Sequence, residues 1–330
     1  MLLKNPKTKK YFYAENNNLA LNWERFNEKA ENQNNLIKFA QENKELFNCI
    51  FAGSSYLSEN IIKDCEYWND AVIKDADALK KEIFENTEKS WQNSEYEKLT
   101  KELRINKMRI ATLTGIMDIS GVWQVMDVTK VLSEFAGLAC HSALNHCITN
   151  IARRGGMEIN ENDADPAKSS GFTILGMGKL GGYELNYSSD IDLIAFYDAE
   201  LIKSDDMYRF QELSVKEFKK FITIMENIDA FGYVFRTDFR LRPNPSMTPI
   251  IMSKNAMLQY YETMGLNWER SAMIKARPIA GNIDVGNKFL DDIRPFIWRK
   301  NLDFEALEDI YSIKTKINKH RNCNDLKLAG

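Results

Sequence analysis

Residues 171–197 read GFTILGMGKLGGYELNYSSDIDLIAFY, and this stretch decides the fold. A short apolar run enters a glycine-rich corner, a polar connection follows, and a second apolar run holds Asp190 and Asp192. The pattern predicts two strands, at about 172–177 and 190–197. Alternate side chains of a strand share a face, so the two carboxylates point the same way. Because neighbouring carboxylates repel each other, this arrangement favours a site where a hard cation such as Mg²⁺ neutralises them.

The glycine corner also matches a different motif. Gly176 to Gly181 spell the GxGxxG pattern of dinucleotide-binding folds, and Asp198 stands near the place of a ribose-binding acid. Such a fold needs a full helix directly after the glycines. Here about nine polar residues precede the next strand, which is too few for a crossover. A Walker A loop is excluded as well, because Lys179 is followed by Leu180 rather than by Ser or Thr.

A later segment, GYVFRTDFRLRP at 232–243, supplies a third acid, Asp238. Its alternation predicts one long strand with an apolar face and a charged face, on which Asp238 accompanies three arginines. Two interpretations of the charged face stay open: a solvent-exposed face with salt bridges, or a binding surface for an anion beside a metal. If this strand lies next to the one with Asp190 and Asp192, the three acids complete a divalent-metal site for phosphoryl chemistry. The charged face consists of Val234, Arg236, Asp238, Arg240 and Arg242, and the apolar face of Tyr233, Phe235, Thr237, Phe239 and Leu241.

More charged residues follow in the sequence. Trp268-Glu269-Arg270 and Lys275-Ala-Arg277-Pro278 are two such groups. Two interpretations of these groups stay open: a structural ion-pair network, or contacts with phosphate or a protein substrate.

The rest of the chain divides around this core. Residues 1 to about 33 are polar and Asn-rich with little periodicity, which is typical of a loose arm. From Leu36 onward apolar residues at helical spacing predict a helical domain, in which Ser54 and Ser55 are candidate N-caps. The acidic stretch 157–170 reads as a linker. We therefore expect an α+β protein with a helical domain over 1–154, a catalytic domain with a small mixed sheet over 155–300, and a truncated helical start over 301–330.

Composition narrows the class of protein. The chain has 330 residues, is 44% hydrophobic and 28% charged, and carries a net charge of −3, so neither nucleic acid nor membrane is an expected partner. No apolar run approaches the roughly 18 residues of a spanning helix, and the N-terminus lacks the apolar core of a signal peptide. The five cysteines are scattered and form no CxxC pair, which favours reduced thiols in a cytoplasm.

Three motifs together resemble a known family. GMGKLGGYELNYSSDIDLI, FRTDFRLRP and YYETMGLNWERSAMIKARPIAG follow one another over about 110 residues. They closely resemble the glutamine synthetase adenylyltransferase/adenylyl-removing enzymes, which belong to the DNA polymerase β-like nucleotidyltransferase superfamily. MRIATLTGIMDISG in the helical region resembles the family more loosely. The resemblance implies a polymerase β-like domain over 155–300, although Gly178-Lys179 stands where many relatives have Gly-Ser.

The resemblance also implies roles for individual residues. Asp190, Asp192 and Asp238 correspond to the catalytic carboxylates that bind one or two Mg²⁺ ions. The glycine corner and the cations after it are the implied contacts for phosphate or nucleotide. This second set comprises Gly178, Lys179, Gly181, Gly182, Ser189, Arg240, Arg242, Lys275 and Arg277.

Members of this family carry two nucleotidyltransferase halves. The N-terminal half removes AMP from a tyrosine of glutamine synthetase by phosphorolysis, giving ADP, and the C-terminal half adds AMP from ATP. The PII signal protein and glutamine control the balance. The segment ELNYSSDID and the helical domain before it resemble the N-terminal half, so we expect Mg²⁺-dependent removal of AMP from adenylylated glutamine synthetase. Two alternatives stay open: an ATP-dependent adenylyltransferase on the same fold, and a truncated, non-catalytic binding module.

Overall fold

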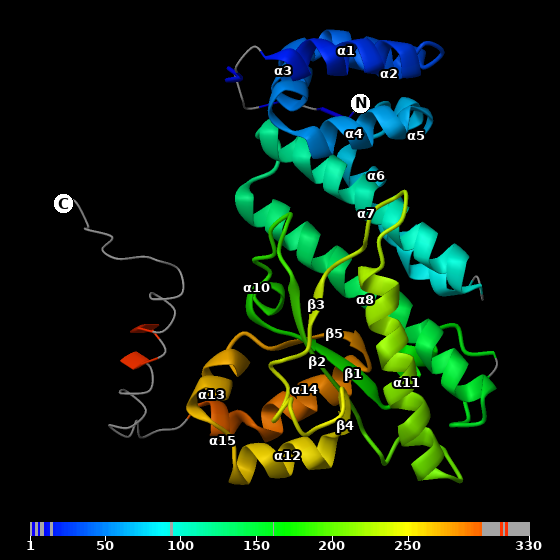
Figure 1. The fold of residues 1–330 in the computed structure, drawn as a ribbon, viewed down its shortest axis with the longest axis vertical. Coiled ribbons are helices and arrows are strands. Elements are labelled where there is room, and N and C mark those ends of the chain that lie inside the picture. The colour runs from blue at the N-terminus through cyan, green and yellow to red at the C-terminus, as the bar shows by residue number, and fades with distance from the viewer. Residues whose placement is uncertain are drawn as a thin grey trace. The chain divides into compact units, whose positions relative to one another are not determined.

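The computed structural model describes residues 2–3, 6, 10–13, 16–92, 95–160, 162–298, 311–312 and 314–315. They form two compact units, each assembled from separate stretches of chain. The first unit holds the residues up to His146 together with Tyr183–Ser189 and Ile222–Arg236. The second holds Cys147–Gly182, Asp190–Phe221 and the described residues from Thr237 onward. The fold is mixed α+β, as predicted (Figure 1), while most of the predicted helical start at 301–330 lies outside the described residues.

The first unit is helical. Among the described residues, no helix of the protein combines the length and apolar character needed to cross a bilayer. The helices of this unit are α1 (Asn17–Lys29), α2 (Asn34–Glu42), α3 (Lys44–Gly53), α4 (Ser55–Lys63), α5 (Cys65–Ala71), α6 (Ala76–Lys89), the short 3₁₀ helix η1 (Ser90–Gln92), α7 (Tyr96–Ile119), and α8 (Val125–Arg153) as far as His146.

The prediction of a loose arm over residues 1–33 is wrong for the part that forms α1. Asn16 caps this helix, because its side-chain oxygen accepts a hydrogen bond from the amide of Leu19 at 3.1 Å. The buried residues of α1 are Asn22 and Phe26, and the Phe26 ring packs 5.6 Å from that of Phe51. Leu19, Trp23 and Phe26 do stand at helical spacing, so the signal of this helix is present in the sequence, but the many asparagines around it outweighed that signal.

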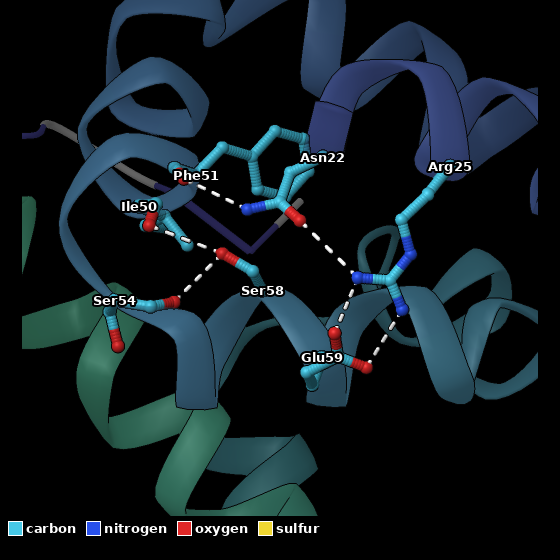
Figure 2. A network of polar contacts seen from close by, with 7 residues as sticks. All are labelled: Asn22, Arg25, Ile50, Phe51, Ser54, Ser58 and Glu59. Atoms are coloured by element: carbon cyan, nitrogen blue, oxygen red, sulfur yellow. Dashed lines mark hydrogen bonds and ion pairs between the residues drawn. The ribbon is translucent and has the colours of Figure 1, made fainter. Parts of the chain in front are cut away.

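A polar network fixes the corner between α3 and α4 (Figure 2). Ser54 is the N-cap of α4, as predicted, and its hydroxyl accepts from the amide of Leu57 at 3.2 Å. The Ser58 hydroxyl donates to the carbonyl of Ser54 at 2.7 Å and lies 3.2 Å from that of Ile50. Arg25 of α1 pairs with Glu59 of α4, so side chains as well as packing hold α4 in place.

The second unit is built on a mixed sheet, as predicted. Its order is β3-β2-β1-β5, with β4 also pairing β2. β1 runs antiparallel to β2 and β5, whereas β3 and β4 run parallel to β2. The antiparallel β1–β2 pair rules out a dinucleotide-binding crossover, which joins parallel strands. The elements are α9 (Pro166–Ser169), β1 (Phe172–Gly176), α10 (Gly178–Gly181), β2 (Ile191–Tyr197), α11 (Met207–Glu226) as far as Phe221, β3 (Thr237–Asp238), β4 (Ile251–Ser253), α12 (Lys254–Thr263), α13 (Asn267–Met273), β5 (Arg277–Gly281), α14 (Ile283–Asp292) and α15 (Arg294–Ile297).

Helices cover both faces of this sheet. On one face, Leu175 and Phe196 pack with residues of α12, α14 and α15, including Phe289 at 4.7 Å from Phe196 (Figure 1). On the other face, the ring of Phe172 lies 5.7 Å from that of Phe210 in α11. Asp198, the acid that a dinucleotide fold would use for ribose, forms a buried ion pair with Lys254 at the start of α12.

The predicted long strand over 233–242 is wrong. Within these described residues, the paired strand is Thr237–Asp238. Before it, the amides of Val234 and Phe235 both donate to the carbonyl of Met225 at 3.0 Å, so the chain closes the end of α11 instead of joining a sheet. Both Val234 and Phe235 are consequently buried, which breaks the predicted alternation of faces.

Lys107 of α7 is a buried cation in the first unit. Its side chain is 7% exposed, and its ammonium lies 4.2 Å from the centre of the Phe235 ring. Burial lowers the pKa of Lys107 from 10.5 to about 8. Below this pKa the folded state holds a desolvated charge, so Lys107 reduces the stability of the unit.

Replacing Lys107 with methionine is expected to stabilise the protein. The Lys107→Met change removes a desolvation cost of about 3 kcal/mol and loses about 1 kcal/mol of attraction to the ring, a net gain of about 2 kcal/mol at neutral pH. The gain should fade as pH rises from about 8 to 10.5, because the neutral lysine no longer carries that cost. Urea unfolding at about pH 7 and about pH 10 measures both effects. Lys81 of α6, whose side chain is 77% exposed, is the control, and a Lys107→Met protein less stable than wild type at pH 7 contradicts the argument.

Candidate active site

The pairing of β2 with β3 aligns two of the three predicted acids. Asp192 stands opposite Asp238 in the parallel register, and Asp190 directly precedes β2. The carbonyl of Asp192 accepts a hydrogen bond from the amide of Met177 at 2.9 Å, which ties the start of β2 to the glycine corner. The structure therefore places the carboxylates of two neighbouring strands at one level, beside the corner.

The acids influence each other electrostatically. Burial raises the pKa of Asp192, and the negative charges of Asp238 and Asp190 raise it further. The pKa of Asp238 is lowered, first by its side-chain hydrogen bonds with Arg240. Arg240 Nε lies 3.0 and 2.8 Å from the two carboxylate oxygens of Asp238, and its backbone amide donates to Oδ1 at 2.8 Å. A guanidinium thus neutralises Asp238 in this structure.

The donor set suits a hard divalent cation, although Arg240 now holds one of its members. Within the described ranges, no three side chains of His, Cys, Asp or Glu converge as a ready metal cluster. Both oxygens of Asp238 are bonded to Arg240, so a cation that binds Asp238 must displace this guanidinium. Asp190, Asp192 and Asp238 offer carboxylate oxygens alone, the ligands that Mg²⁺ prefers. Burial first, and then the charges of Asp238 and Asp190, raise the pKa of Asp192, and a bound cation would relieve the repulsion among the three carboxylates.

The corner that carries Gly178, Lys179, Gly181 and Gly182 is a four-residue helical turn, α10. Gly178 has a φ of 51°, and a Cβ there would lie 3.3 Å from Asp192 Oδ2. A Cβ on Gly181 would lie 1.8 Å from the carbonyl oxygen of Lys275. Arg277 at the start of β5 donates to the carbonyls of Leu180 and Gly181 at 3.1 Å each. The backbone of residues 275–277 therefore encloses the corner next to Asp192.

Arg242 stabilises the loop that follows β3. Its guanidinium donates to four backbone carbonyls, those of Phe239, Pro245, Thr248 and Pro249. Prolines remove amide donors from this loop, so a side chain supplies the missing ones. The three prolines after Arg242, at 243, 245 and 249, are the sequence signal that could have suggested this role.

The predicted residues Ser189, Lys275 and Glu269 make contacts that do not involve the three acids. Ser189 belongs to the first unit, where its hydroxyl lies 2.6 Å from the side-chain oxygen of Asn186, and it directly precedes Asp190 in the chain. Lys275 contributes its backbone carbonyl to the enclosure of Gly181. Glu269 is buried and accepts from the Tyr260 hydroxyl at 3.0 Å and from the amide of Leu266 at 2.9 Å, which favours the structural reading of its motif.

The fold and the site together define a class of protein. Acids on adjacent strands of a small mixed sheet, beside a glycine corner, form a nucleotidyltransferase-like domain. The chain belongs to the family described as Glutamate-ammonia ligase adenylyltransferase, whose family model matches residues 44–292.

Curated relatives share one printed name, bifunctional glutamine synthetase adenylyltransferase/adenylyl-removing enzyme. The protein from Agrobacterium fabrum is 37% identical over 292 residues, which cover 87% of this chain and 30% of the relative. That from Rhizobium meliloti is 41% identical and that from Bradyrhizobium sp. (strain BTAi1) 42% identical, each match covering 69% of this chain and 23% of the relative. The chain thus spans less than a third of the length of these relatives.

Gly181→Ala is expected to disrupt the corner. The new methyl group would collide with the Lys275 carbonyl, a backbone atom that cannot rotate away, so the free energy of unfolding should fall by about 3 kcal/mol. Gly53→Ala is the matched control, because a Cβ there has no heavy atom within 4 Å among the described residues, and it should change stability by less than about 1 kcal/mol. Thermal unfolding of both variants measures the difference, and equal stability of the two would contradict the predicted collision.

Asp238→Asn should lower the pKa of Asp192. The change removes a neighbouring negative charge and releases Arg240, whose own charge already lowers this pKa. Carbon-detected NMR titration of the aspartate carboxyls measures the change, with Asp205→Asn, an exposed position, as the control. A pKa of Asp192 that stays the same or rises would contradict this expectation and would mean that the lost repulsion is absent or is offset by movement of the released Arg240 away from Asp192.

Proposed function

We propose that this chain removes AMP from adenylylated glutamine synthetase by Mg²⁺-dependent phosphorolysis. The supporting observation is the register of β2 and β3, which sets Asp192 opposite Asp238 beside the lysine-bearing corner. Family membership and the names of the relatives support glutamine synthetase as the protein substrate. The segment ELNYSSDID, which follows a helical domain, supports removal rather than addition of AMP.

In the proposed reaction, an oxygen of inorganic phosphate attacks the phosphorus of the tyrosyl-AMP. The bond from phosphorus to the tyrosine oxygen breaks, its electron pair leaves with that oxygen, and the product nucleotide is ADP. Asp190, Asp192 and Asp238 would hold one or two Mg²⁺ ions, which supply charge neutralisation at the transferred phosphoryl group. Lys179 and the amides of the corner bind phosphate oxygens.

Arg240 has two partners in this proposal. It neutralises Asp238 in the structure, and its side chain is 84% exposed. Released from Asp238, the guanidinium can bind the incoming phosphate, for which its planar donors are suited. The residue therefore keeps Asp238 neutralised in the resting site and attracts the anionic reactant during the reaction.

Regulation and location follow from the same proposal. The PII signal protein and glutamine are the proposed controlling partners, and phosphate, ADP and ATP are the proposed small-molecule ligands. The described cysteines Cys49, Cys65, Cys140 and Cys147 are free thiols, which supports a cytoplasmic location.

Replacing Asp190 and Asp192 with asparagine together tests the proposal. The double variant should release ADP from adenylylated glutamine synthetase, with phosphate and Mg²⁺ present, about 100-fold more slowly than the wild type. Asp205→Asn should keep the wild-type rate. An unchanged rate in the double variant contradicts the site.

Two further assays separate the alternatives. ATP-dependent labelling of unmodified glutamine synthetase, without ADP release, would assign the opposite direction to this chain. Tight Mg²⁺-independent binding of glutamine synthetase without either reaction would assign a binding module instead.

A further inference from the structure

The first unit contains a pocket that the proposed reaction does not use. Its volume is about 570 Å³, which is enough for a small molecule. Residues of α4 and α7 form two of its walls, and the segments 187–189 and 231–235 complete the lining. All of these residues belong to the first unit, so the pocket is defined within one compact body.

Three buried side chains of the pocket lining carry nitrogen donors, and two of these nitrogens lack an acceptor. Lys107, Arg104 and Asn60 are 7%, 5% and 7% exposed. Arg104 Nε has no hydrogen-bond partner in the part of the chain that the structure describes. Asn60 Nδ2 has none by distance and angle, although the Asn60 side chain offsets part of the rise in the pKa of Tyr56 that burial causes. Lys107 contacts the Phe235 ring, and no carboxylate of the described residues lies within ion-pair distance of it. Buried donors of this kind are costly unless an acceptor reaches them.

The nearby acids are already bonded to other donors. Asp229 accepts from Arg104 Nη1 at 2.6 Å and from the amide of Phe231 at 2.7 Å. Asp118, on the pocket wall, accepts from the Tyr187 hydroxyl at 3.1 Å. A ligand acceptor would satisfy Arg104 Nε and Asn60 Nδ2. An anion would in addition pair with Lys107, because the charge of Arg104 is already paired with Asp229 and that of Lys107 has no carboxylate partner among the described residues.

The wall beside these donors is aromatic. Phe231, Tyr233 and Phe235 line the pocket, and the face of Phe235 lies against the Lys107 ammonium. An apolar, planar ligand body packs well against such rings. Ser54, the N-cap of α4, lines the pocket too, and the network in Figure 2 holds that wall in place.

We propose that this pocket binds a small amphipathic anion, with a compact carboxylate or phosphate head on Lys107, Arg104 and Asn60 and a planar apolar body against the aromatic wall. The site lies beyond the proposed phosphorolysis, because its donors belong to none of the acids, the glycine corner or the later cations. Its lining shares one residue, Ser189, with the contacts that the family resemblance implies for phosphate or nucleotide. A bound anion also offsets the destabilising burial of Lys107.

Isothermal titration calorimetry on the full chain, in EDTA, tests the proposal. Phenyl phosphate and benzoate are the probes, and inorganic phosphate and phenol are the partial probes that lack the body or the charge. At least one full probe should bind more tightly than both partial probes, and the tighter of the two identifies the preferred head group. Lys107→Met should weaken this binding by at least about tenfold, the loss expected for a buried charged hydrogen bond.

The variants separate this site from the others. Lys81→Met on α6, where the lysine side chain is 77% exposed, should bind like the wild type, whereas Asn60→Ala should weaken binding in the same direction as Lys107→Met. The variant with asparagine at both 190 and 192 should keep full affinity. Equal binding by Lys107→Met and wild type, or no binding of either full probe, would overturn the proposal. Loss of binding in the double asparagine variant would overturn it too, because the probe would then occupy the candidate active site.

Discussion

The close approach of Gly181 to the backbone of Lys275 is the constraint on which the candidate site depends. A side chain at 181 has no room, so the corner between β1 and β2 can lie directly against the chain that enters β5. Arg277 bonds to the corner carbonyls from the same strand. This enclosure fixes the corner beside Asp192, whose carboxylate lies close to the Cα of Gly178. The position of the acids relative to the corner is thus set by backbone packing, which side-chain rotation cannot relax.

The cations of the second unit differ in whether their partners are fixed parts of the fold or can be exchanged. Arg242 and Arg277 satisfy backbone carbonyls, and Lys254 pairs with the buried Asp198. Arg240 stays exposed at the surface with a carboxylate partner that a cation could take over. A cation with fixed backbone partners is costly to move, whereas an exposed one exchanges partners easily. Among these cations, Arg240 is the one whose surroundings suit a changing partner.

The sequence predicted the parts of the fold that have strong local periodicity. The two strands around the glycine corner, the mixed sheet and the helical region were expected, and Asp238 does lie opposite Asp192. The prediction of a long strand over 233–242 was wrong because the alternation of residues carries no information about the end of α11. There the carbonyl of Met225 accepts hydrogen bonds from the amides of Val234 and Phe235. The helix α1 was missed because the many asparagines around it outweighed the helical spacing of Leu19, Trp23 and Phe26. The donors of the anion pocket, Arg104 and Lys107, look like an exposed helix face in sequence, since burial comes from distant segments.

The two compact units interleave along the chain. The stretches Tyr183–Ser189 and Ile222–Arg236 leave the second unit and complete the first, and each then continues directly toward an acid, Asp190 or Asp238. A gene segment that ended at residue 154 would encode a first unit without its aromatic pocket wall. For this protein, recombination between relatives can therefore exchange the helical and catalytic parts together far more readily than one without the other.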